Sequence, residues 1–254
     1  RFRNVTGVQT CALPISSRAF RAAVELHESL AKNRDWSKSS EGTLAERYLA
    51  ATHGNIAALE TELTPQSALN SYARALTIQR SLAERFPQQL ELTADLALTC
   101  NNLGALQSRM NNHAAASESY AEAIVSLRRL VATAPSSIPH RRNLALSLNN
   151  QGLALARDGN SADAERSFRQ AAEVQQALVS EHPENLDEVS SLGGIWNNLG
   201  LMLEGQRQVS RSIAAYEKAL EIQQAVVVAG PMSPRSREYF DRTLVNFSRI
   251  CREQ

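Results

Sequence analysis

Several residue types are scarce in this chain of 254 residues, and each scarcity excludes a class of protein. The 11 glycines and 8 prolines are too few for the many turns of an all-β protein. No apolar run approaches the roughly 18 residues that a membrane-spanning helix requires. Aromatic residues make up only 5% of the chain and the formal net charge is +1, so nothing favours a polyanionic partner such as a nucleic acid. With 43% hydrophobic residues, the chain can still fold around a core, and the composition favours helices.

Residues that carry catalytic or metal-binding chemistry form no recognisable arrangement. The 5 histidines occupy unrelated positions, and Cys100 and Cys251 lie far apart on expected core faces, so we expect no metal site, no disulfide and no cofactor. Phosphate-binding loops, G-x-S-x-G elbows and kinase motifs are missing from the sequence. The sequence therefore predicts a protein that is not an enzyme, and its unpaired cysteines favour a reducing compartment such as the cytoplasm.

The N-terminal residues differ in character from the rest of the chain. Val5 to Ile15 match, residue for residue, the translation of a common sequencing-library adapter. We therefore expect residues 1–16 to be a non-native leader that takes no part in the fold. The alternative is a genuine polar leader.

A repeat of 48 residues organises the remaining sequence. Aromatic residues and prolines both recur at this interval: Tyr72, Tyr120, Phe168 and Tyr216, and Pro87, Pro135, Pro183 and Pro231. Each repeat contains two stretches with apolar residues at helical spacing, separated by turn residues such as those at 158–161. One helix pair cannot bury its apolar face alone, so neighbouring pairs stack. The sequence predicts an all-α fold, an alpha-alpha superhelix of antiparallel helix pairs with about ten helices.

The repeat divides residues 17–254 into segments. We expect a partial repeat at 17–38, repeats at about 39–87, 88–135, 136–183 and 184–231, and a final helix at 235–253. The other helices are predicted at 17–32, 41–60, 66–84, 89–109, 114–132, 138–157, 162–180, 186–205 and 210–228.

The residues inside each repeat follow a known pattern. It appears as Trp196, Leu199, Gly200, Ser212, Tyr216 and Ala219, and again as Leu148, Gln151, Gly152, Ala164, Phe168 and Ala171. This pattern resembles the tetratricopeptide repeat over residues 17–254, although the usual period of that family is 34 residues and each helix here is longer by about two turns. The long period also resembles the arrays of bacterial proteins that carry a serine/threonine kinase domain and, more distantly, the cargo-binding repeats of kinesin light chains. The resemblance implies a groove, on the concave face, that binds proteins.

Asparagine recurs at one position of every first helix. The residues are Asn55, Asn102, Asn150, Asn198 and Asn246, with Asn101, Asn149 and Asn197 directly before three of them. Asparagine is an indifferent helix former, so its recurrence in mid-helix needs a reason. The resemblance implies that this position faces the groove, where the amides bind the backbone of a peptide. The alternatives are hydrogen bonds from helix to helix between repeats, or plain exposure to solvent.

Cations are largely missing from the expected groove. A clamp for the carboxylates of an acidic C-terminus needs Lys or Arg at positions that here hold Leu98, Leu146, Gly194, Ala105, Leu153 and Leu201. The clamp is therefore disfavoured, and amides beside apolar residues suit a peptide with hydrophobic anchors. Arg242, Asn246 and Arg249 share one face of the last helix, which we interpret as a solvated cap. Arg128-Arg129 and Arg141-Arg142 are interpreted as a solvated rim.

Three hypotheses for function follow. The favoured one is a protein-protein interaction scaffold that binds a peptide or protein segment on the concave face, without nucleic acid and without membrane insertion. The second is the regulatory tail of a larger signalling enzyme such as a serine/threonine kinase. The third is a structural solenoid that associates with itself through exposed terminal repeats.

Overall fold

The computed structural model describes residues 40–230 and 232–252, together with residues 22, 24–26 and 29. These residues form helices and turns and no strand, which confirms the all-α fold class. The expected leader at 1–16 lies outside the described residues, as does most of the expected helix at 17–32. The chain divides into two compact units, residues 1–110 and residues 111–254, each of which is described by itself.

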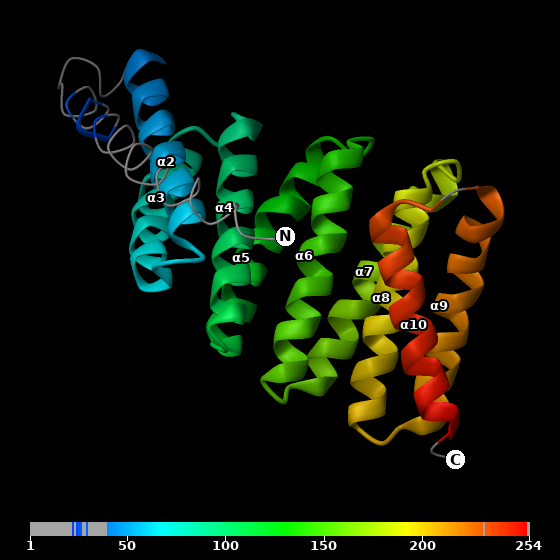
Figure 1. Cartoon of the computed structure of the whole chain (residues 1–254). Helices are drawn as coiled ribbons and strands as arrows, with labels where there is room; N and C mark the ends of the chain where they lie inside the picture. Colours follow the sequence, from blue (N-terminus) through cyan, green and yellow to red (C-terminus); the bar gives the residue numbers. More distant parts are fainter. Residues whose placement is uncertain (1–21, 23, 27–28, 30–39, 231, 253–254) are drawn as a thin grey trace, which may run out of the picture. The chain divides into compact units, whose positions relative to one another are not determined.

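From residue 40 onward, unit 1 consists of three packed helices that run one after another along the chain (Figure 1). They are α2 (Ser40–Glu60), α3 (Pro65–Arg85) and α4 (Leu90–Arg109). Each packs against the other two, and their core holds Ala57, Ala68, Tyr72 and Leu106. Pro65 begins α3 at a position where its missing N–H costs no hydrogen bond.

Unit 2 holds the six helices that follow. They are α5 (His113–Thr133), α6 (Ile138–Arg157), α7 (Ser161–Glu181), α8 (Leu186–Gly205), α9 (Val209–Ala229) and α10 (Pro234–Arg252). Each helix packs against the next one in the chain, and α8 also contacts α6 and α10 directly. The predicted helices from residue 41 onward agree with these bounds to within one residue at each end.

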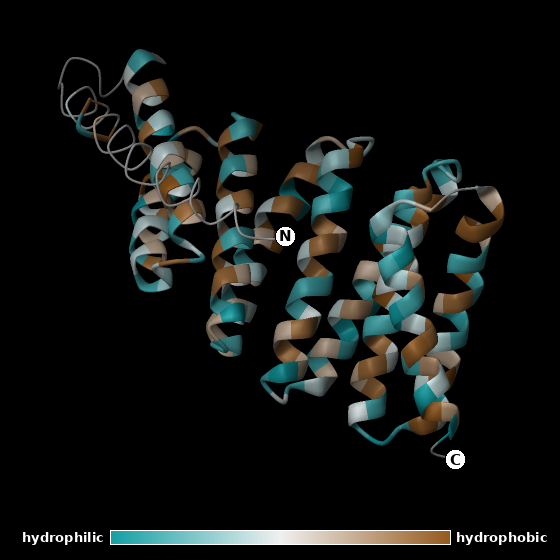
Figure 2. Ribbon diagram, viewed as in Figure 1, coloured by the Kyte–Doolittle hydropathy of each residue, from teal (hydrophilic) through white to brown (hydrophobic). Residues whose placement is uncertain are grey.

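Amphipathic helices and short turns explain this arrangement. Every helix carries both hydrophobic and hydrophilic residues along its length (Figure 2), so burying one side requires a neighbouring helix. The turns inside successive repeats place one residue in the left-handed region at the same interval of 48, namely Asn111, Gly159 and Arg207. Only glycine adopts that backbone without steric cost, so the turn at Gly159 is the least strained of the three.

Glycine and an aromatic residue join the two helices of a repeat. A Cβ atom added at Gly200 would lie 2.7 Å from the ring of Tyr216, and one added at Gly152 would lie 2.8 Å from the ring of Phe168. Both rings are fully buried. The absence of a side chain on the first helix therefore lets the ring of the second helix pack against its backbone.

Candidate functional site: a groove along three first helices

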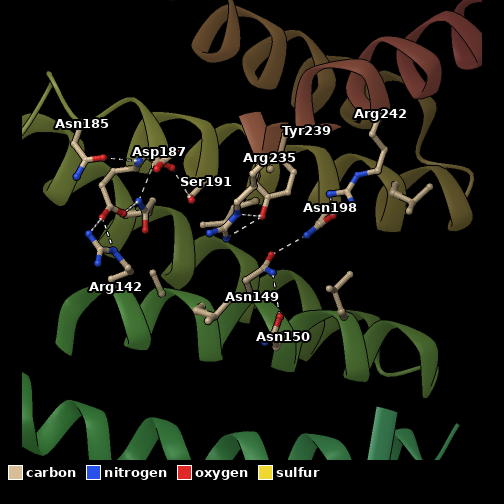
Figure 3. A pocket seen from close by; sticks show the side chains of 18 of the residues that line it. Arg142, Asn149, Asn150, Asn185, Asp187, Ser191, Asn198, Arg235, Tyr239 and Arg242 are labelled. Atoms are coloured by element: carbon tan, nitrogen blue, oxygen red, sulfur yellow. Dashed lines mark hydrogen bonds and ion pairs between the residues drawn. The ribbon is translucent and has the colours of Figure 1, made fainter. Parts of the chain in front are cut away.

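The first helices of three successive repeats, α6, α8 and α10, line a pocket of about 570 Å³ in unit 2. Figure 3 shows its floor, with side chains from all three helices turned toward one another. We call this pocket the groove. Because α8 contacts both α6 and α10, the groove follows residues that recur once per repeat, which is where a repeat array presents an extended surface.

A chain of asparagine amides runs across the groove floor (Figure 3). Nδ2 of Asn198 donates to Oδ1 of Asn149 at 2.9 Å, and Nδ2 of Asn149 donates to Oδ1 of Asn150 at 3.5 Å. The chain continues on its other side, where Nδ2 of Asn246 donates to Oδ1 of Asn197 at 2.9 Å and Asn197 donates to Asn198 at 3.5 Å. We call these five side chains the amide ladder. Each amide inside it both donates and accepts, so the ladder links α6, α8 and α10.

The ladder leaves one amide open. Asn150 accepts from Asn149, but within the described part of the chain its own Nδ2 donates to no acceptor, and the residue is half-buried at the groove. Asn197 and Asn246 are buried and do not line the groove. An amide that holds two uncommitted N–H groups at the edge of a pocket can donate to the carbonyl of a bound chain.

The remaining predicted asparagines lie in unit 1. Asn55 and Asn102 are exposed on α2 and α4. Asn101 is half-buried, and its Oδ1 has no partner among the described residues. The structure thus brings together the asparagines of α6, α8 and α10, five of the eight that the sequence singled out.

Leucines flank the ladder where a carboxylate clamp would have cations. Leu146, Leu153 and Leu201 all line the groove, and Leu146 and Leu201 are each 43% exposed. Apolar side chains that remain this exposed inside a pocket are available to a ligand. The groove therefore combines amide donors with apolar contact area.

One end of the groove holds a buried carboxylate that the sequence did not single out. Glu188 is 2% exposed and accepts hydrogen bonds from Arg142 and from Nε2 of Gln175, the latter at 2.7 Å. Its backbone N–H is capped by the side chain of Asn185 at 3.4 Å. In a full capping box the glutamate side chain would turn back to the helix start, whereas here it turns inward because a buried charge needs ionic and hydrogen-bonding partners.

At the other end, α10 contributes a tyrosine between two arginines. Tyr239 lies over Gly194, where an added Cβ would be 3.4 Å from its ring, and Arg235 and Arg242 line the groove on either side of it. The interpretation of α10 as a solvated cap is therefore incomplete, because α10 packs on α8 and α9 and Arg242 reaches Oδ1 of Asn198 at 3.4 Å. The only sequence signal for Tyr239 is Gly194. It stands at the position that Leu146 occupies one repeat earlier, and without a side chain it leaves room for the tyrosine ring.

Arg249 of the same helix does not line the groove. It forms an ion pair with Glu204 of α8, which also accepts from the hydroxyl of Tyr216 at 2.6 Å. Burial opposes ionisation of Glu204, but the hydrogen bonds from Arg249 and Tyr216 outweigh it and lower the pKa of the carboxyl below its usual value. Burial and the neighbouring carboxylate both raise the pKa of Tyr216. This cluster therefore joins α8, α9 and α10 as a structural contact.

Two sequence interpretations are wrong in part. The solvated rim does not include Arg141, which is buried and pairs with Glu181. Arg128, Arg129 and Arg142 are exposed as expected, and Arg142 pairs with Glu188. Cys100 is buried as expected, but Cys251 is exposed. The corresponding residue of α8 is Leu203, which is 2% exposed in a cluster with Phe168 of α7 and Ala215 of α9.

The described residues contain no group of three or more metal-ligating side chains. None of the described helices is both long and apolar enough to span a bilayer.

The comparisons with known proteins point to one family. A family model described as the tetratricopeptide repeat matches residues 144–184, and a second model with the same description matches residues 193–226. These segments contain α7 and much of α6, α8 and α9. No curated protein sequence matches the chain.

Two solved structures are similar to the chain. The crystal structure of BtubC (BKLC) from P. vanneervenii is 18% identical, with 92% of this chain and 88% of that chain covered and a TM-score of 0.54. A tetratricopeptide repeat protein from Parabacteroides merdae is 14% identical, with 89% and 99% covered and a TM-score of 0.23. At 18% identity, the similarity to BtubC shows the fold alone. The two matched segments, with the glycine-aromatic contacts inside them, are tetratricopeptide repeats.

Proposed function

We propose that this protein is a protein-interaction scaffold whose groove along α6, α8 and α10 binds an extended peptide segment of a partner. Tetratricopeptide arrays present surfaces of this kind to proteins, and the groove has the polar and apolar groups that peptide binding needs. The observation that carries the proposal is the open end of the amide ladder, where Asn150 holds two N–H groups for which the described residues offer no acceptor.

The chemistry of the groove fits a main chain better than a small molecule. An amide donates to a backbone carbonyl without reading the side chain beside it. The exposed side chains of Leu146 and Leu201 lie in the same pocket and offer contact to hydrophobic side chains of the same peptide. Peptide recognition commonly combines main-chain hydrogen bonds with pockets for a few side chains.

Peptides selected from a random 12-residue display library on the full chain provide the test. Asn150→Ala should weaken a selected peptide by about 3- to 10-fold, which corresponds to one lost hydrogen bond, and helicity should not change because Nδ2 of Asn150 supports no contact in the fold. Asn143→Ala is the matched control, because Asn143 is exposed on α6 and does not line the groove. Equal affinity of the wild type and the Asn150 variant would remove the groove assignment.

A further inference from the structure

Arg235, Tyr239 and Arg242 form a compact cluster at the α10 end of the groove (Figure 3). The guanidinium carbon of Arg235 lies 5.5 Å from the centre of the Tyr239 ring, and that of Arg242 lies 5.4 Å from it. Arg235 also donates from Nε and Nη2 to the Tyr239 hydroxyl, at 3.2 and 3.1 Å. Since Tyr239 rests on the backbone of Gly194, both arginines are held against a ring that has little room to move.

Neither guanidinium has a carboxylate partner within the described ranges. Arg242 donates to the neutral amide oxygen of Asn198, at 3.4 Å. Arg235 donates to the Tyr239 hydroxyl; the charges of Asp187 and Glu188 also act on it, but neither carboxylate forms an ion pair with it. Other arginines nearby are neutralised: Arg142 pairs with Glu188, and Arg249 pairs with Glu204. The cluster therefore presents positive charge that no ion pair among the described residues offsets.

The charge of the whole groove points the same way. Four arginines line it (Arg142, Arg157, Arg235 and Arg242) against two carboxylates (Asp187 and Glu188), so its lining carries 4 − 2 = +2 charges. The chain as a whole carries only +1, so this excess is a local feature. A partly enclosed site strengthens the attraction between opposite charges relative to open solvent.

We propose that Arg235 and Arg242 bind an anionic side chain of the peptide that occupies the groove. The inference rests on the proposed function and names the chemistry of its ligand: a carboxylate or a phosphoryl group at one position, with hydrophobic residues beside it. The planar guanidinium presents its N–H donors in a fork that matches both kinds of oxygen anion. The aromatic ring between the two arginines keeps their stems extended into the groove, so less side-chain entropy is lost on binding.

Binding by fluorescence anisotropy tests the site. Peptides selected from the random library on the wild-type chain should be enriched in Asp and Glu over Lys and Arg. One selected peptide is then made with Glu, phosphoserine or neutral Gln at its acidic position. The double variant Arg235→Gln/Arg242→Gln should weaken the Glu or the phosphoserine peptide by about 10- to 100-fold, as expected for the loss of charge-assisted hydrogen bonds, while the Gln peptide should bind both proteins equally.

Arg128→Gln is the matched control, because Arg128 on α5 donates to Gln170 and does not line the groove. This change should leave all three affinities unaltered. Salt should weaken the Glu peptide more than the Gln peptide. The tighter of the two anionic peptides identifies the source of the anion.

Two failures can be told apart. The anion site is overturned if the selected peptides show no acidic bias, or if the anionic peptides bind the double variant as tightly as the wild type. The proposed function survives this result as long as Asn150→Ala still weakens peptide binding. Peptides that are insensitive both to Asn150→Ala and to the double arginine variant overturn the proposed function together with this inference.

Discussion

Two glutamines one repeat apart should respond in opposite ways to the same substitution. Gln175 and Gln223 occupy equivalent positions in α7 and α9, and both are almost completely buried. Nε2 of Gln175 donates to the carboxylate and to the backbone carbonyl of Glu188, at 2.7 and 3.0 Å. Neither amide atom of Gln223 has a partner in the described structure, because the residue that corresponds to Glu188 one repeat later is Ser236.

The magnitudes follow from these contacts. Gln175→Met removes a hydrogen bond to a buried charge, which costs about 1.5–3 kcal/mol. Gln223→Met removes two buried polar atoms that have no partner, which gains about 1–3 kcal/mol. Methionine matches glutamine in length and shape, so the gain from burying a more apolar side chain is common to both variants. The free energies of unfolding of the two variants should therefore differ by about 2.5–6 kcal/mol. Leu127, at the same position of the preceding repeat, shows that this site accepts an apolar residue.

Urea unfolding followed by circular dichroism measures this difference. With a slope of about 3 kcal/mol per molar urea, the midpoints of the two variants should lie roughly 1–2 M apart, on opposite sides of the wild type. Repeat arrays unfold partly repeat by repeat, so amide hydrogen exchange in α8 and α9 supplies a local measure of the same effect. Equal shifts of both midpoints in one direction would refute the hydrogen-bond assignment.

Further predictions concern packing and pH. Gly200→Ala should destabilise the protein by about 1–2 kcal/mol, because the clash of the new Cβ with the ring of Tyr216 outweighs the gain in helix propensity. Gly205→Ala should stabilise it, because an added Cβ there meets nothing within 4 Å. Chemical denaturation compares the two variants, and equal effects on the free energy of unfolding would contradict the packing of Tyr216 on Gly200. The lowered pKa of Glu204 stabilises the fold at pH values above the unfolded pKa of a glutamate, about 4.3, and this contribution is lost as the pH falls through the lower folded pKa. Melting temperatures measured from pH 7 to pH 3 should therefore fall less steeply for Glu204→Gln than for the wild type, and parallel curves would show that Glu204 is not responsible.

Much of the fold follows from the 48-residue period, because helix ends depend on local residues. Prolines, asparagine caps and turn residues recur with the period, and the described helices begin and end within one residue of the expected positions. The glycine-aromatic contact is equally local, since Gly152 and Phe168 stand at a fixed separation in one repeat.

The candidate site was predictable only in part, because it depends on contacts between repeats. The period places Asn150 and Asn198 at equivalent positions, but which amide donates to which depends on the spacing of neighbouring helices. The exposure of Cys251 depends on what covers α10, and the position of Tyr239 depends on Gly194 of α8, so neither follows from a pattern within one repeat. The hypotheses of a kinase-linked regulatory tail and of self-association stay predictions.

The most direct test of the account is the side-chain amide spectrum of the full chain, measured by nuclear magnetic resonance during titration with a selected peptide. The Nδ2 resonances of Asn150 should shift, while those of Asn246, which donates to Asn197 inside the fold, should stay in place. Shifts confined to Trp196, which lines a separate pocket with residues of α7 and α9, would contradict the claim that the groove binds the peptide.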